Sequence, residues 1–324
     1  MDVFEVFLPV AGVQFNWLIL LFIGFSVGLM GGFFGIGGGP ILTPALNIFG
    51  FPMAVAIGTG MLNVFGQSIV GLRKHVNLNN VCVRLGLMVG GAMLAGVELG
   101  KQIVMRLEKF NLEGSTVRVV YLVLLIGLTI RFLHDYLAAR RRGDHRAKHD
   151  ESTESAATEE RPKPKAVLAL SIGLGVGMLA GFLGVGGGFL LVPAFIYLLG
   201  LPTSMAVGTS VLCCVLSGAY GGISYAAQGR MDLIAVLLML TGASFGAQFG
   251  ASAVKYAASY GLRLLYGVML LMAAVGVLLK QLDEMIATVD LSFAAQLVVL
   301  VTAGSIGLTI LSKLVLGMRA DMRA

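Results

Sequence analysis

Gly32–Gly39 reads Gly-Phe-Phe-Gly-Ile-Gly-Gly-Gly, and Gly181–Gly188 reads Gly-Phe-Leu-Gly-Val-Gly-Gly-Gly; Pro44 and Pro193 follow at the same spacing. Both runs lie in uncharged, apolar sequence. In hydrocarbon every backbone N–H and C=O must be satisfied within the protein, so a broken helix persists only where protein or a wet cavity surrounds it. Corresponding breaks in two halves of a chain are typical of the substrate site of a secondary transporter.

The composition indicates an integral membrane protein. Of the 324 residues, 57% are hydrophobic and only 12% are charged, and the mean hydropathy is +0.90. Val6–Leu72 and Ala166–Gly229 contain no Asp, Glu, Lys, Arg or His. Each stretch has room for about three helices of roughly 20 residues. We therefore predict an all-α polytopic membrane protein, with a retained first span and no cleaved signal peptide.

Several other functions are disfavoured by the same residues. The formal charge of +6 suggests nucleic acid, but no basic patch alternates with aromatic residues, and positive-inside topology explains the charge better. The three cysteines, Cys82, Cys213 and Cys214, show neither pairing nor metal-ligand spacing. We expect them to be packing residues, and we expect no metal, cofactor or nucleic-acid partner.

The chain divides into two related halves around a charged segment. Ala56-Ile57-Gly58-Thr59 corresponds to Ala206-Val207-Gly208-Thr209, and Gly96–Gly100 corresponds to Gly246–Gly250. The predicted organisation is a first membrane repeat at 1–138, a cytoplasmic linker at 139–165, a second repeat at 166–280, and an extra C-terminal transmembrane helix with its tail at 281–324.

Two topologies remain open. The short segments that follow the glycine runs either cross the membrane or re-enter it. If they cross, each half has five passes, the N-terminus lies outside, and the Arg-rich linker and the basic tail lie inside. This arrangement, which predicts inverted repeats, is preferred over four passes per half because the loop charges fit it.

The glycine runs do not match a nucleotide-binding loop. Pro40 stands where a dinucleotide fingerprint needs its third glycine, and no Gly-Lys-Ser/Thr ending completes a phosphate loop. The remaining hypothesis is a broken helix whose free N–H groups face a small anion. We expect Gly37, Gly38 and Gly39 in the first half, and Gly186, Gly187 and Gly188 in the second, to approach it. The alternative is close packing of small residues between helices.

These duplicated runs, each closed by a proline and followed by Ala-x-Gly-Thr, resemble the sulfite exporter TauE/SafE family, also called the toluene-sulfonate uptake permease family. The resemblance covers nearly the whole chain except the linker and the last span. It implies a transporter that moves a small sulfur-containing anion, sulfite or an organosulfonate such as sulfoacetate, across the bacterial inner membrane. The linker and extra span are less typical and leave a homo-oligomer open.

Polar residues within the spans are the next candidates. Thr59, Asn63 and Gln67 recur at four-residue steps and share one helix face, and the second half offers the same face in Thr209, Cys213 and Ser217. Their hydroxyl and amide groups are the donors that sulfonate oxygens need. Ordinary hydrogen bonding between helices is the alternative role.

Charged residues suggest coupling and attraction of the anion. Glu98 is the only acidic residue deep within a predicted span, and Gln248 takes its place in the second half. An isolated carboxylate there can couple anion movement to a proton, or it can pair with a basic side chain. Arg73 and Arg84 are expected near the cytoplasmic mouth, where they attract anions or simply extend to the interface.

Two other functions compete with the carrier. A passive anion channel uses the same breaks and donors, but homologous halves favour alternating access. An intramembrane serine hydrolase is the remote alternative, because Gly242–Gly246 matches Gly-x-Ser-x-Gly. No histidine is expected within reach of Ser244, so the chain is not predicted to be an enzyme.

Overall fold

The computed structural model describes residues 4–34, 39–141, 166–253, 259–286 and 291–321. A short antiparallel hairpin precedes the first half, whose elements are β1 (Glu5–Leu8), β2 (Val13–Asn16), α1 (Trp17–Phe34), α2 (Gly39–Ile48), α3 (Met53–Asn77), α4 (Val83–Glu108) and α5 (Glu113–Arg141). The second half and the extra helix comprise α7 (Ala166–Leu183), α8 (Gly188–Leu199), α9 (Thr203–Ala226), α10 (Leu233–Ala253), α11 (Ser259–Met285) and α12 (Ser292–Asp321).

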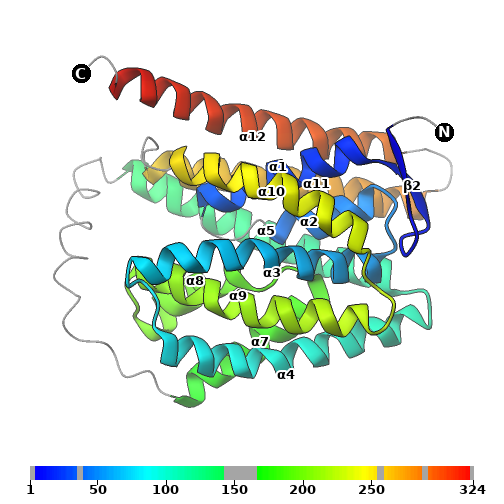
Figure 1. Cartoon of the computed structure of the whole chain (residues 1–324), viewed down its shortest axis with the longest axis horizontal. Helices are drawn as coiled ribbons and strands as arrows, with labels where there is room; N and C mark the ends of the chain where they lie inside the picture. The colour runs from blue at the N-terminus through cyan, green and yellow to red at the C-terminus, as the bar shows by residue number, and fades with distance from the viewer. Residues whose placement is uncertain (1–3, 35–38, 142–165, 254–258, 287–290, 322–324) are drawn as a thin grey trace.

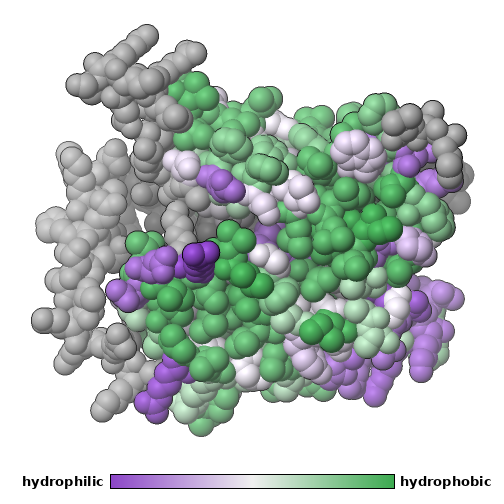
Figure 2. Space-filling view, viewed as in Figure 1, coloured by the Kyte–Doolittle hydropathy of each residue, from purple (hydrophilic) through white to green (hydrophobic). Residues whose placement is uncertain are grey.

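The helices form one bundle of membrane-spanning dimensions (Figure 1). Among the described residues, eight helices are long and apolar enough to cross a membrane, while α1 and α8 contribute shorter apolar helices. On the face seen in Figure 2, apolar side chains dominate the middle and hydrophilic ones gather mainly toward the two ends of the bundle. The predicted all-α polytopic fold is confirmed.

The two ends of the bundle differ in what they carry. Phe15, just before α1, packs its ring 5.6 Å from that of Phe49 and 6.0 Å from that of Phe51, both just after α2. The outer ends of α1 and α2 therefore lie together with β1 and β2, at what we call the hairpin end. The last residues of α5, the start of α7 and the end of α12 lie at the opposite end, the linker end (Figure 1). The hairpin and the helix ends that flank the linker thus occupy opposite ends of the bundle.

Helices of one half pack mainly against helices of the other half. In each half the first helix packs along the fourth helix of the other half: α1 with α10, and α7 with α4. The corresponding helices α3 and α9 pack on each other, as do α5 and α11. Helices α3 and α9 are antiparallel, because Gly58 meets Tyr225 while Gly71 meets Val211. Helices α5 and α11 are antiparallel as well, because Arg118 meets Gln281 while Phe132 meets Tyr266. Neither half therefore buries its helices without the other.

Glycine allows the paired helices α1 and α10, and α4 and α7, to approach closely. A methyl group at Gly28 of α1 would lie 2.3 Å from the carbonyl oxygen of Ala243, and one at Gly177 of α7 would lie 2.5 Å from that of Met93. Without a hydrophobic driving force between helices in lipid, such small-residue seams gain their stability from close backbone packing. The glycines that flank Ser244 belong to the α1–α10 seam.

Three boundaries differ from the sequence prediction. The hairpin Glu5–Asn16 was not anticipated, because its strands are short and precede a long apolar run. Helix α5 continues through Arg141, into the segment assigned to the linker, and α12 reaches Asp321. Hydropathy marks where the membrane ends, whereas a helix can continue into water as long as its backbone bonds remain intact.

Candidate functional site

The break between α7 and α8 is made by backbone that only glycine adopts readily. Gly184, Gly186 and Gly187 have φ values of 75°, 68° and 85°. This left-handed region costs other residues roughly 1–2 kcal/mol. The repeated glycines are therefore required by the turn itself, at the point where one helix ends and the next begins.

The carbonyl groups released by this break are satisfied by side chains from both halves. Tyr121 donates its hydroxyl to the oxygen of Leu183, and Thr43 donates to that of Gly184 at 3.2 Å. Ser217 donates to the oxygen of Gly186 at 2.9 Å. These three carbonyl groups thus meet the requirement that membrane-buried backbone be hydrogen-bonded.

The N–H groups of the same turn are not used in this way. Within the described part of the chain, the N–H groups of Val185, Gly186 and Gly187 donate to no acceptor. They precede the N-terminus of α8, where backbone donors and the helix dipole favour an anion. The turn therefore has spare N–H donors, which suits an oxyanion.

The first-half break is seen only at its end. Gly37 and Gly38 lie outside the described residues, whereas Gly39 begins α2 and is buried. A methyl group at Gly39 would lie 2.4 Å from the carbonyl oxygen of Val185. The start of α2 and the turn before α8 are therefore in direct contact, so the two predicted motifs meet in the middle of the protein.

Asn63 is the polar side chain that the protein leaves unsatisfied. It is fully buried at 0% exposure, yet neither its amide nitrogen nor its oxygen has a hydrogen-bond partner in the described structure. The buried Nε2 of Gln67, one turn further along α3, also lacks an acceptor. Leaving such groups unpaired costs about 1–3 kcal/mol each, so these amides are suited to a ligand.

The position of this face of α3 follows from its neighbours. Ala56, two turns before Asn63 on the same face, packs in a cluster with Leu42 and Leu46 of α2. In the second half, Cys213 and Ser217 hold the corresponding positions, and Ser217 bonds to the break. The sulfur atom of Cys213 contacts the Gly86 oxygen at 3.4 Å. The two faces therefore adjoin the broken helices of their own halves.

Thr59 and Thr209 make equivalent contacts across the halves. The hydroxyl oxygen of Thr59 accepts the N–H of Asp232 at 3.1 Å, and that of Thr209 accepts the N–H of Cys82 at 3.0 Å. A methyl group at Gly58 would lie 2.0 Å from the oxygen of Arg230. The Ala-x-Gly-Thr motifs thus hold the loop before the fourth helix of the opposite half.

We expect Thr59→Val to destabilise the protein rather than to remove ligand binding. The substitution leaves the buried N–H of Asp232 without an acceptor, which costs about 1–3 kcal/mol and lowers the melting temperature of the purified protein. Thr129→Val is the matched control, because the Thr129 hydroxyl bonds only to the Leu125 oxygen of its own helix. Lost binding with unchanged stability in Thr59→Val would instead place the hydroxyl on the ligand.

Glu98 is not the isolated carboxylate that the sequence suggested. Its Oε2 lies 2.8 Å from Nζ of Lys101, three residues further along α4, and it also accepts the hydroxyl groups of Tyr220 at 2.9 Å and Ser224 at 3.1 Å. Sequence reasoning missed Lys101, although the spacing of three residues places both charges on one helix face. The expectation of apolar surroundings for Glu98 is wrong.

Comparison with known proteins identifies the fold that carries these breaks. The family model described as sulfite exporter TauE/SafE matches residues 20–277. This chain belongs to the TauE/SafE family. Its match spans both glycine runs and both Ala-x-Gly-Thr motifs, and it ends before α12. No solved structure matches the chain.

Relatives of this TauE/SafE protein are named as transporters. The probable membrane transporter protein YdhB of Bacillus subtilis is 25% identical over 72% of this chain and 89% of its own length. A probable membrane transporter protein of Xylella fastidiosa is 27% identical over 82% and 94%, and one of Haemophilus influenzae is 25% identical over 81% and 98%. None of these names specifies a substrate.

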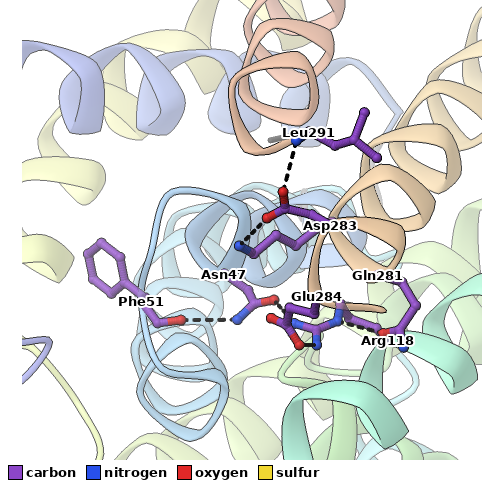
Figure 3. Close-up of polar contacts among 8 residues, drawn as sticks. Asn47, Phe51, Arg118, Gln281, Asp283, Glu284 and Leu291 are labelled. Atoms are coloured by element: carbon purple, nitrogen blue, oxygen red, sulfur yellow. Dashed lines mark hydrogen bonds and ion pairs between the residues drawn. The ribbon is translucent and has the colours of Figure 1, made fainter. Parts of the chain in front are cut away.

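A buried arginine of this TauE/SafE chain was not singled out as a site residue. Arg118 of α5 is 3% exposed and donates to Asn47 at 3.0 Å, to Gln281 at 2.8 Å and to Glu284 (Figure 3). Asn47 in turn donates to the oxygen of Phe51 at 3.0 Å. The guanidinium joins the end of α2 to α5 and α11 at the hairpin end.

The remaining predicted residues lie away from the breaks. Arg73, near the end of α3, and Arg84, at the start of α4, are exposed at the linker end. Ser244 donates its hydroxyl to the oxygen of Leu240 at 2.7 Å, within its own helix. Gly242 and Gly246 beside it pack on the backbone of α1, and neither the family nor the named relatives indicate catalysis.

Proposed function

We propose that this membrane transporter carries a small sulfur-containing anion, sulfite or an organosulfonate such as sulfoacetate, across the bacterial inner membrane by alternating access. The family description names sulfite export. Spare N–H donors at Gly186 and Gly187, together with the amides of Asn63 and Gln67, are the neutral donors that a sulfonate accepts. From the correspondence of the two glycine runs, we expect Gly37, Gly38 and Gly39 to offer equivalent donors from the first half.

The unpartnered carboxamide of Asn63 carries this proposal. A protein retains a buried amide with both polar atoms unpaired, at about 1–3 kcal/mol for each lost hydrogen bond, only where something else repays the loss. A ligand with oxygen acceptors does so for Nδ2. A protonated oxyanion such as bisulfite also offers a donor to Oδ1.

The geometry of the halves supports alternating access. Corresponding helices α3 and α9 are antiparallel, and the exchanged pairs α1–α10 and α4–α7 repeat the same packing. Antiparallel packing of corresponding helices supports inverted repeats, in which a two-fold axis in the membrane plane relates the halves. Exchanging the conformations of two such halves opens a central site first to one side and then to the other.

Counterflow in proteoliposomes tests the carrier directly. Vesicles preloaded with unlabelled sulfite or sulfoacetate should accumulate the same labelled anion transiently and saturably, since a carrier exchanges one bound anion for another. A passive channel, the alternative function, equilibrates the label without an overshoot. Absence of any sulfur-anion flux, with flux of another anion, would contradict the proposed substrate class.

Side-specific labelling tests the topology. On a cysteine-free background, Val3→Cys and Ser152→Cys should react from opposite sides of right-side-out membranes, with Ser152→Cys protected until the membrane is permeabilised. The reason is that basic residues gather at the linker end, which the positive-inside rule places in the cytoplasm. Equal reactivity from one side would contradict both the topology and the inverted repeat.

A further inference from the structure

A charged cluster lies between α4 and α9. Nζ of Lys101 lies 2.8 Å from Oε2 of Glu98 and 2.6 Å from Oγ of Ser224. Glu98 also accepts the Tyr220 hydroxyl at 2.9 Å and Nε2 of Gln102 at 3.2 Å. The Lys101 side chain is 10% exposed and that of Glu98 is 29% exposed.

Packing alone does not require these charges. Gly96 and Gly100 pack on the backbone of α7, and Gly246 and Gly250 pack in the same way on α1. In this second seam Gln248 and Ala251 stand where the first has Glu98 and Lys101. Intramembrane charges are expensive and mark ion or substrate pathways, so the asymmetry indicates a role that only the first seam performs.

The groups around the Glu98 carboxylate form an anion-binding set. An ammonium, a phenol hydroxyl and a carboxamide N–H all donate to it, and an external oxyanion would use the same donors. We infer that the Glu98 carboxylate occupies the place of the transported anion when no anion is bound, and that Lys101 is the cation that binds that anion. When Glu98 takes one proton from water its charge is lost, and Lys101, Tyr220 and Gln102 become free for one anion.

The charge of the Glu98 side chain controls whether the cluster can accept an anion. The described ionisable groups that face it are Lys101 on α4 and Tyr220 and Tyr225 on α9; α7 contributes none. One turn before Lys101, Val97 packs against Gly181 and Gly221. The cluster therefore adjoins the α4–α7 seam at the level of the second break.

This inference rests on the proposed anion transport and deepens it. It names a charged station beside the second break, and it accounts for coupling of one proton to one anion. A monovalent sulfonate then moves together with one proton and without net charge.

The test is anion binding to the purified full-length protein, measured as a thermal shift at pH 5 and at pH 8. Methanesulfonate is the probe because its own charge is constant over this range. The wild type should bind it at least tenfold more tightly at pH 5. Glu98→Gln should bind it equally at both pH values, and Lys101→Met should lose binding. Gln248→Leu, the matched control in the second seam, should behave as the wild type.

The double variant Glu98→Gln/Lys101→Met guards against misfolding, because it removes both charges instead of leaving a carboxylate unpaired. It should remain folded and fail to bind. Binding by the double variant, or wild-type pH dependence in Glu98→Gln, overturns the inference. If nitrate reproduces the whole pattern, the charged station stands and the sulfur preference of the proposed function fails. If methanesulfonate binds every variant alike, the station fails while anion binding stands.

Discussion

Asn63→Leu is expected to make the purified protein more stable to heat while weakening its binding of sulfite and sulfonates. Asn63 is fully buried with both amide atoms unpaired, and leucine is similar in size and has no polar atoms to desolvate. Removing the unpaired groups should raise the free energy of unfolding by about 1–3 kcal/mol. Losing the ligand hydrogen bonds should weaken binding by about 10- to 100-fold.

Asn47→Leu is the matched control. Asn47 is also buried, at 8% exposure, but its nitrogen donates to Phe51 and its oxygen accepts from Arg118. The same substitution should therefore lower stability by about 3 kcal/mol, because it leaves part of a buried guanidinium unpaired. Differential scanning fluorimetry in detergent measures both variants. If Asn63→Leu is as destabilised as Asn47→Leu, the Asn63 amide has a structural partner and does not serve a ligand.

Gly177→Val is expected to abolish folding of the transporter. The first side-chain atom at this position would lie 2.5 Å from the oxygen and 2.6 Å from the Cα atom of Met93. Both are backbone atoms of α4 and cannot rotate away, so α7 and α4 must separate along their shared seam. We expect a loss of about 4 kcal/mol or more, seen as aggregation in size-exclusion chromatography and as the absence of a cooperative melt.

Gly175→Val provides the comparison on the same helix. No atom lies within 4 Å of a methyl group placed there, and the residue is exposed. Both variants replace glycine by valine in the same helix, so they differ only in whether the new side chain meets α4. A monodisperse, stable Gly177→Val protein would mean that the two helices are not in backbone contact.

Regularities that are local in the chain were predictable. The glycine runs indicated the helix breaks, since glycine adopts φ values such as the 68° and 85° of Gly186 and Gly187 at no steric cost. The four-residue spacing of Asn63 and Gln67 placed both unpartnered amides on one face. Apolar runs located the spanning helices, although charge could not show that α5 continues through Arg141.

Assignments that depend on distant residues were not predictable. Thr59 meets Asp232, and Arg118 meets Gln281 and Glu284, across more than a hundred residues of chain. Even Glu98 was misjudged: the spacing to Lys101 was visible, but the contribution of Tyr220 from α9 was not.

The sequence by itself determined that two related halves cross a membrane and that each is broken at a glycine run, because hydrophobic length and backbone freedom are properties of consecutive residues. Only the tertiary structure decided which polar groups are used and which are left for a ligand. Thr59 and Asn63 look alike in the sequence, four residues apart on one helix. The rotation of α3 against its neighbours gives Thr59 a backbone partner from the other half and leaves Asn63 without a partner among the described residues.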